Sequence, residues 1–220
     1  MAELTTKRAF NAAVESAIAA AEAYYDTDIQ VMTDGEYDAL IDDIATAVDQ
    51  HPDWDPKGLL TEVSAGTSGG GSIMHPVPML SLGKVKELSD VRDFVTRVAT
   101  RVIVEPKLDG LAVRAEYAAG KLVLVATRGD GLTGEDVTNQ AIAVQGLPVR
   151  LKKPLTLEVR GEVFMTDADF LAASANRVAA GKPAFANPRN ATAGSLRNTD
   201  SVYETPMSFA AYDASGPDAN

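Results

Sequence analysis

The sequence predicts an α+β fold in which helices come first and an antiparallel sheet follows. Apolar residues recur at helical spacing over residues 5–25 and again over 35–50. Further along, residues 111–118 and 121–127 have the composition of β-strands, and Ala119-Gly120 between them suits the turn of a β-hairpin. The other expected elements are an extended, proline-restricted segment at 75–82, helices at 87–100 and 167–180, and strands at 156–164 and 207–213. We therefore expect a hairpin of two facing helices at the front of the chain and a sheet behind it.

Length and composition fit a small module followed by a larger domain. The chain has 220 residues, of which 45% are hydrophobic, enough to bury a core. A Gly/Ser-rich stretch over residues 64–72 divides a helical module at 1–66 from a core at 67–220. This stretch is either a plain linker or a hinge that lets the front module swing over the core.

No segment predicts a membrane or secretory role. No apolar run reaches the roughly 18–20 residues that a membrane-spanning helix needs, and the N-terminus lacks the apolar core of a signal peptide. The chain has no cysteine, which excludes disulfides and thiolate metal sites, and its two histidines make a structural zinc site unexpected. These features fit a cytoplasmic protein.

The charge balance argues against tight duplex binding by this chain alone. It has 20 basic and 31 acidic residues, a net charge of −11, whereas non-specific DNA binding depends on neutralising phosphates with Lys and Arg. Any DNA contact is therefore expected to be local, at a basic patch, or to need other polypeptide segments that grip the duplex.

The helical module carries aromatic and acidic residues that suit a ligand. We expect Asp34 to be the N-cap of the second helix, without a capping box because Tyr37 stands three residues later. Tyr24, Tyr25 and Tyr37 are either hairpin core or part of a site. Asp34 and Asp38 lie one helical turn apart and share a face. Carboxylates beside aromatic rings suit a cationic aromatic ligand.

The stretch over residues 102–118 is where the sequence points most directly to chemistry. Its apolar and β-branched residues predict two strands, and Pro106 and Gly110 in the motif EPKLDG should interrupt pairing between them. This turn presents Lys107 between two carboxylates. A lysine is a nucleophile only when neutral, and since its ordinary pKa is about 10.4, burial or cationic neighbours are required. The alternative is a solvated turn lysine that pairs with Asp109.

Features that suit phosphate and ribose follow in the second half of the chain. Residues 128–136, RGDGLTGED, form a Gly-rich loop whose backbone N–H groups can approach a phosphate or ribose, although such loops are also plain turns. Arg128 supplies a guanidinium that matches phosphate geometry. Glu162, near the end of a strand, can accept a hydrogen bond from a ribose hydroxyl. Small residues after Arg189 predict either a buried turn or the close approach of a phosphate backbone.

Several multi-residue motifs stand in a fixed order along the chain. The second half contains EPKLDG, ATRGDGLTGEDVT, EVRGEV and FANPRNATAGSLR, and the first half contains YYDTDIQVMTDGEYDAL and HPVPMLSLGKV. Together these motifs resemble the adenylation domain of bacterial-type NAD-dependent DNA ligases, and the resemblance covers nearly the whole chain. It implies a nucleotidyltransferase (ATP-grasp-like) core on antiparallel sheets, with a front module that grips the nicotinamide mononucleotide (NMN) half of NAD.

The resemblance also implies a reaction and residue roles. Lys107 attacks NAD, retains AMP and releases NMN, with Mg²⁺ neutralising the phosphates, for the sealing of nicked DNA in replication and repair. Asp109 orients the lysine or a metal-bound water. The residues implied to hold the adenosine end are Ser81, Leu82, Glu105, Arg128, Glu162 and Tyr212. Those implied at the NMN end are Tyr24, Tyr25, Asp34, Tyr37 and Asp38, with Tyr25 standing where many members have histidine. Arg189 and Arg197 are implied in DNA contact and step chemistry.

Compared with the family, the chain is expected to be C-terminally incomplete. No D-G-[IV]-V-x-K type segment follows residue 200, and the oligonucleotide-binding (OB) and later regions of full ligases are absent. Such a chain is a truncated ligase, one half of a split ligase or a degraded relative. We favour the split ligase, in which a second subunit supplies the missing lysine motifs and OB fold. Two alternatives remain open, a non-catalytic NAD- or NMN-binding subunit of a split ligase and an ATP-dependent nucleotidyltransferase. The front tyrosines and aspartates argue against the latter because ATP has no nicotinamide to hold.

Overall fold

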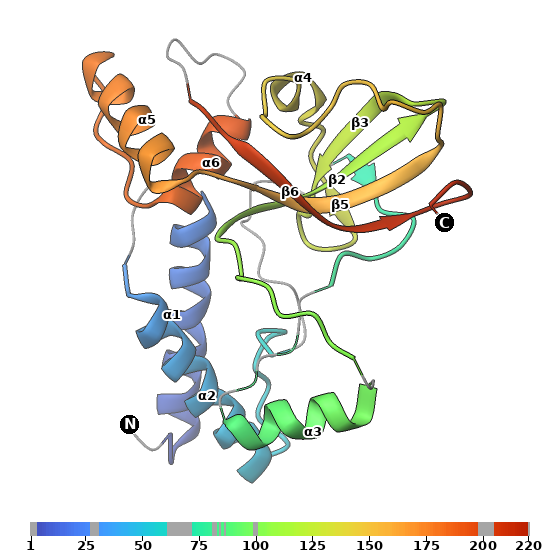
Figure 1. Ribbon diagram of the computed structural model, residues 1–220. Helices are drawn as coiled ribbons and strands as arrows, with labels where there is room; N and C mark the ends of the chain where they lie inside the picture. The colour runs from blue at the N-terminus through green and yellow to red at the C-terminus, as the bar shows by residue number, and fades with distance from the viewer. Residues whose placement is uncertain are drawn as a thin grey trace.

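The protein combines helices with antiparallel strands, which confirms the α+β class in its coarse form (Figure 1). The computed structural model describes residues 4–26, 31–60, 72–80, 83, 85, 87–98, 101–197 and 205–219. The predicted connector at 64–72 lies outside these residues except for Ser72, and Ser81 and Leu82 also lie outside them.

Two helices at the front of the chain pack on each other, α1 (Lys7–Asp26) and α2 (Asp34–Gln50). Phe10 and Ile44 are fully buried in the core that they share. The ring of Trp54, just after α2, lies with its centroid 5.1 Å from that of Phe10. Burial of these apolar stripes stabilises the helix pair, since isolated helices of this length are marginal in water.

The start of α2 differs from the sequence prediction. Thr33, and not Asp34, is the N-cap, and its hydroxyl accepts a hydrogen bond from the backbone N–H of Glu36 at 3.3 Å. The Glu36 carboxylate accepts the backbone N–H of Thr33 at 2.8 Å in return. This arrangement is a capping box, so the prediction of an Asp34 cap without a box was wrong.

The central sheet has four strands in the order β3-β2-β5-β6, and each neighbouring pair is antiparallel. The strands are β2 (Gly110–Ala118), β3 (Lys121–Thr127), β5 (Leu157–Phe164) and β6 (Ser208–Ser215). The predicted hairpin turn between β2 and β3 is confirmed. Ala119 and Gly120 have φ values of 48° and 77°, the left-handed conformation that two-residue hairpin turns require.

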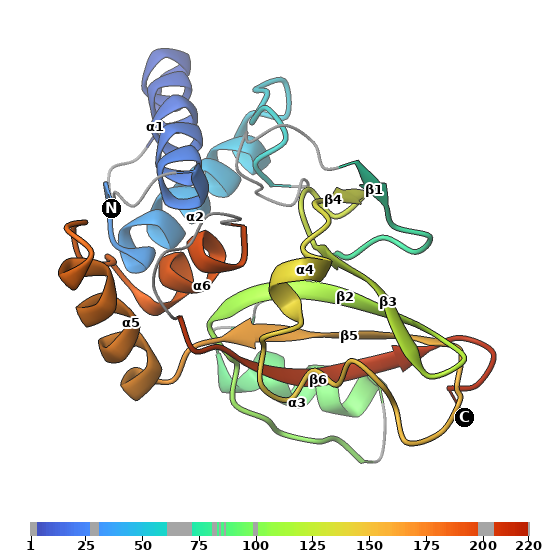
Figure 2. The same cartoon turned by 90° about the horizontal axis from the view of Figure 1, so that it is seen from above.

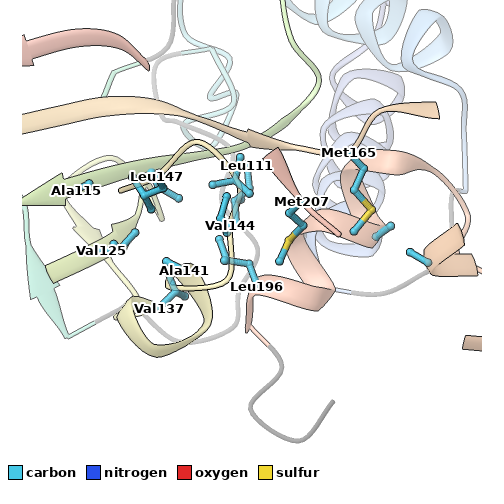
Figure 3. Packing of buried hydrophobic residues seen from close by; sticks show 14 of the residues in the cluster. Leu111, Ala115, Val125, Val137, Ala141, Val144, Leu147, Met165, Leu196 and Met207 are labelled. Carbon is cyan, nitrogen blue, oxygen red and sulfur yellow. The ribbon is translucent and has the colours of Figure 1, made fainter. Parts of the chain in front are cut away.

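One face of the sheet is apolar and forms the main core. Val113 and Val163 are fully buried there, because alternate residues of a strand point to the same side. The short helix α4 (Thr138–Ala141) and helix α6 (Pro188–Arg197) contribute side chains to this core, and Figure 3 shows Leu196 of α6 among them.

Helix α6 occupies a stretch where the sequence suggested a buried turn. A helix forms because Asn187 caps it, with its side-chain oxygen accepting the backbone N–H of Asn190 at 2.7 Å. Pro188 takes the first helical position, where a missing N–H leaves no hydrogen bond unmade. Ala191 and Thr192 are fully buried in the interface with the sheet, so the small residues do serve tight packing.

The other predicted helices are α3 (Leu88–Val98) and α5 (Asp167–Ala179). Figure 1 shows α3 set apart from the sheet, and none of its described residues is buried. The predicted strand at the start of 102–118 was wrong. Residues 101–109 form no strand, and Ile103 and Val104 are 81% and 91% exposed. β-branched residues favour a strand only against neighbouring strands, and among the described residues none pairs with this stretch.

A short two-stranded ladder joins the sheet to an extended segment. Strand β1 (Ile73–Met74) pairs antiparallel with β4 (Thr133–Gly134), and Figures 1 and 2 show this pair on the side of the molecule away from α5. The chain then continues through two prolines as far as Leu80 without regular secondary structure, as predicted. We refer to residues 73–80 as the strap.

Among the residues that the structure describes, no helix combines the length and apolar character that crossing a bilayer requires.

Two glycines should respond in opposite ways to the same substitution. A Cβ added at Gly134 would lie 1.8 Å from the backbone oxygen of Thr127, whereas one added at Gly35 in α2 meets nothing within 4 Å. We expect Gly134→Ala to lower the free energy of unfolding by about 1–3 kcal/mol and Gly35→Ala to raise it by up to about 1 kcal/mol. Urea denaturation followed by circular dichroism measures both, and equal effects would contradict the tight approach of β4 to β3.

Candidate functional site

The face of the sheet opposite the core is polar, and Glu162 lies on it. The β2–β5 register sets Glu162 opposite Ala112, and the carboxyl side chain is partly buried. Burial raises the pKa of Glu162 above its ordinary value. Three cations oppose this rise through their charge, in order of effect Arg189, Lys107 and Arg128, and a backbone hydrogen bond with Gly110 also opposes it.

These three cations come from three separate parts of the chain. Lys107 precedes β2, Arg128 follows β3 directly, and Arg189 lies in the first turn of α6. The backbone N–H of Arg128 donates to the carbonyl of Ala112 at 2.9 Å, which fixes Arg128 beside the residue opposite Glu162. The sheet register therefore gathers positive charge around one half-buried carboxylate.

The lysine turn, residues 105–110, is largely open to solvent. The side chains of Glu105 and Lys107 are exposed, and that of Asp109 is 61% exposed. The structure therefore leaves this lysine open to solvent, and the expected burial of its amine is not seen. The Asp109 Oδ1 lies 3.6 Å from the Arg189 Nη1, so this carboxylate pairs with α6.

The Gly-rich loop is closed by hydrogen bonds of its own. The Asp130 carboxylate accepts the backbone N–H groups of Leu132 and Thr133 at 2.8 and 2.6 Å. The hydrogen bond from Thr133 is the main reason that the pKa of Asp130 lies below its ordinary value. Gly129 and Gly131 have φ values of 55° and 89°, so their missing side chains permit this turn.

A second arginine of α6 reaches the same loop. The Nε of Arg197 lies 2.8 Å from Oε2 of Glu135, just after β4. Helix α6 thus contacts the lysine turn through Arg189 and the Gly-rich loop through Arg197. Both arginines were predicted from the resemblance as DNA-contacting residues, and the structure places both beside acidic side chains of these two loops.

Tyr212 lies on β6 where the pairing with β5 is irregular. The register shifts between Arg160 and Gly161, which leaves Tyr212 between the partners of those two residues. Its side chain is 57% exposed, and the burial that remains, followed by the charge of Glu162, raises the pKa of the phenol. A largely exposed ring on this face is available to stack on a flat ligand.

The residues expected at the NMN end belong to the two front helices. Tyr37 packs partly buried against the core of α1 and α2, and its hydroxyl is buried without a hydrogen-bond partner. Asp38 follows it on α2. Tyr24 and Tyr25 lie in the last turn of α1 and Asp34 begins α2, but their side chains lie outside what the structure describes.

Sequence reasoning missed a set of charged residues on the polar face, Arg114, Glu116, Glu158 and Arg160. The available signal was the alternation of charge along the two strands, R-x-E in β2 and E-x-R-x-E in β5. His75 was also missed as a structural contact. It is 5% exposed, its Nε2 donates to the carbonyl of Arg128 at 3.0 Å, and burial lowers the pKa of its imidazole.

The described residues do not gather a metal site. No cluster of three or more His, Asp or Glu side chains that could hold an ion occurs within the described ranges.

A half-buried carboxylate, three cations and a Gly-rich loop meet near one face of the sheet, an arrangement typical of nucleotide-binding domains. The chain belongs to the family of NAD-dependent DNA ligase adenylation domains, whose family model matches residues 70–219.

Three proteins similar to this chain are named as DNA ligases. The protein called DNA ligase 2 of Streptomyces coelicolor is 43% identical over 211 residues, 93% of this chain and 30% of its own length. DNA ligase 2 of Pseudarthrobacter chlorophenolicus is 41% identical over 212 residues, 96% of this chain and 30% of its own length. A DNA ligase of Methylorubrum extorquens is 43% identical over 211 residues, 87% of this chain and 26% of its own length. The chain thus spans less than a third of these relatives.

The burial of Glu162 has a measurable consequence for stability. Because its folded-state pKa is raised, the folded protein keeps a proton that the unfolded chain releases as the pH rises above about 4.5. This carboxyl therefore lowers the free energy of unfolding as the pH increases towards neutral. Glu162→Gln removes the titration, so we expect the variant to gain stability relative to the wild type between pH 4.5 and 7.

Urea denaturation at a series of pH values tests this expectation. Glu15→Gln is the matched control, because it makes the same substitution at a residue that is 71% exposed on α1. A Glu162→Gln variant that loses stability relative to wild type as the pH rises would mean that the cations stabilise the carboxylate more than burial destabilises it.

Proposed function

We propose that the chain performs the first step of NAD-dependent DNA ligation, the transfer of AMP from NAD to Lys107. The observation that carries this proposal is the gathering of Lys107, Arg128 and Arg189 around Glu162. In this arrangement the reacting lysine, two arginines that can bind phosphate and a carboxylate that can bind ribose lie close to one another. Membership of the ligase family supports NAD as the nucleotide.

In this step the neutral amine of Lys107 attacks the α-phosphorus of NAD in line. An N–P bond forms, the P–O bond of the diphosphate breaks, NMN leaves with the electron pair, and the amine loses a proton to solvent. Arg128 and Arg189 stabilise the negative charge that develops on the phosphate oxygens. The result is a phosphoramidate between Lys107 and AMP.

The remaining residues position the adenosine. Glu162 accepts a hydrogen bond from a ribose hydroxyl, and Tyr212 stacks on the adenine with Ser81 and Leu82 beside it. Glu105 also acts at the adenosine end. Asp109, held 3.6 Å from Arg189, orients the lysine turn. When phosphate binds Arg189, Asp109 would give up its ion pair with that arginine.

Mg²⁺ is proposed as the ion that neutralises the NAD phosphates. The described residues do not fit a preformed protein cage for it, because they hold no cluster of carboxylates. Magnesium commonly binds through substrate phosphates and one or two carboxylates, so the ion would enter with the dinucleotide.

The front of the chain, residues 1–66, is proposed as a helical hairpin module that grips NMN, and residues 67–220 as the nucleotidyltransferase (ATP-grasp-like) core. Tyr24, Tyr25, Asp34, Tyr37 and Asp38 would hold the nicotinamide half. The buried Tyr37 hydroxyl without a partner supports a role beyond packing, since such groups normally hydrogen-bond.

Nicked DNA is the proposed final substrate, in replication and repair. The net charge of −11 supports the need for further polypeptide to grip the duplex. A second ligase subunit with the missing lysine motifs and OB fold would supply both that grip and additional phosphate contacts. The alternative is a non-catalytic NAD- or NMN-binding subunit of a split ligase, with which the exposed side chain of Lys107 is also compatible.

Intact-mass spectrometry of the purified chain, with and without NAD and Mg²⁺, tests the reaction. We expect the wild type to gain about 330 Da and Lys107→Ala to gain nothing, because the adduct is on that amine. Lys152→Ala, at an exposed lysine away from the site, should behave as wild type.

Each other outcome separates the alternatives. An adduct that persists in Lys107→Ala would contradict the proposed nucleophile. An adduct formed from ATP and not from NAD would identify an ATP-dependent nucleotidyltransferase. NAD binding in equilibrium dialysis without an adduct, even after addition of the missing ligase regions, would identify a non-catalytic subunit.

A further inference from the structure

A network of buried charges on the polar face has no part in the chemistry above. Arg114 is 1% exposed, and its Nη1 donates to Glu158 at 3.1 Å and also to Glu116. The other oxygen of Glu158 accepts the Nε–H of Arg160 at 2.8 Å. Glu158 and Arg160 are only 15% and 14% exposed. Removing charges from water is unfavourable unless they are well partnered, so each of these side chains depends on the others for its buried position.

The free ends of both arginines reach the strap. Arg160 donates from Nη2 to the carbonyl of Val77 at 2.8 Å and from Nη1 to that of Pro78 at 3.1 Å. Arg114 lies with Nη2 at 3.5 Å from the carbonyl of Met74. The strap therefore rests on the sheet through its carbonyl groups.

On its other side the strap is bonded to the Gly-rich loop. The backbone N–H of His75 donates to the carbonyl of Leu132 at 2.9 Å, and that of Met79 donates to Gly131 at 2.8 Å. The His75 ring adds its contact to the Arg128 carbonyl. The strap is thus the layer that connects the loop carrying Arg128 to the strand carrying Glu162.

Local sequence explains why a side chain must hold this segment. Pro76 and Pro78 have no N–H, so the strap cannot extend the β1 ladder beyond its two residues. Hydrophobic burial holds it mainly through Met79, which is 4% exposed, since Val77 and Leu80 are 61% and 73% exposed. A guanidinium offers several donors in a fixed fork and can serve two consecutive carbonyls at once.

We propose that Arg160, oriented by Glu158, is a positioning residue for the nucleotide site: it fixes the strap, and through the strap it holds the Gly-rich loop in register with Glu162. Arg160 and Glu162 are two residues apart on β5 and so project from the same face. Strand β5 therefore carries both Glu162, the proposed ribose-binding carboxylate, and Arg160, which anchors the strap and through it the Gly-rich loop. The effect on nucleotide binding rests on the proposed function, whereas the anchoring of the strap does not.

Hydrogen–deuterium exchange of the apo chain tests the anchoring directly. In Arg160→Gln we expect the amides of His75 and Met79 to exchange about 10-fold to 100-fold faster, the loss typical of a hydrogen bond to a charged group. Amides of the β2–β3 hairpin should stay protected. Arg160→Lys should also loosen the strap, because one ammonium cannot span both carbonyls. Arg150→Gln, at an exposed arginine, is the matched control.

Calorimetric titration with AMP tests the consequence for the site. Both Arg160 variants should bind AMP about tenfold more weakly. In adduct formation, the NAD concentration for half-maximal rate should rise while the rate at saturating NAD stays near wild type.

Unchanged exchange of the strap amides in Arg160→Lys and Arg160→Gln would overturn the anchoring. Uniform loss of protection over strap and hairpin in Arg160→Lys would overturn it as well. Strap loosening with unchanged AMP affinity would overturn its link to the site. A wild type that neither binds AMP nor forms an adduct would instead refute the proposed function, while the exchange result would still decide the anchoring.

Discussion

The site depends on the partial burial of one carboxylate, Glu162, among three cations. Burial alone makes the ionised form unfavourable, and the surrounding arginines and lysine offset part of that effect. The β2–β5 ladder creates this situation, because it sets Glu162 opposite Ala112, whose carbonyl in turn holds the backbone of Arg128. A shift of one residue in that ladder would turn the carboxylate towards the apolar core.

One face of the sheet is packed in the core, and the other is the face that we propose binds the nucleotide. The apolar face packs on α6 through small residues such as Ala191, and this close packing brings the first and last turns of the helix to the lysine turn and the Gly-rich loop. Arg189 reaches the lysine turn and Arg197 reaches the Gly-rich loop. The polar face holds the strap through buried arginines, so stability of the fold and geometry of the site share the same side chains.

Local signals in the sequence predicted the β2–β3 hairpin, β5 and α5, since turn chemistry and periodicity act within a few residues. The signals for two helix starts were present but misassigned: the capping box begins at Thr33, and Asn187 followed by Pro188 caps α6. The strand expected at 102–104 fails because it has no partner among the described residues. Lys107, Arg128 and Arg189 could be proposed one by one, but only the register of distant strands brings them to Glu162, and single-sequence reasoning cannot supply that register.

We infer that the polar face of the sheet is the adenosine-binding surface. Two-dimensional amide NMR of the isotope-labelled chain, titrated with AMP, can test this inference. We expect saturable shifts concentrated at Gly110, residues 128–134 and residues 160–162, with α5 unaffected. Shifts confined to α5 or to the front helices, or the absence of any saturable shift, would contradict it.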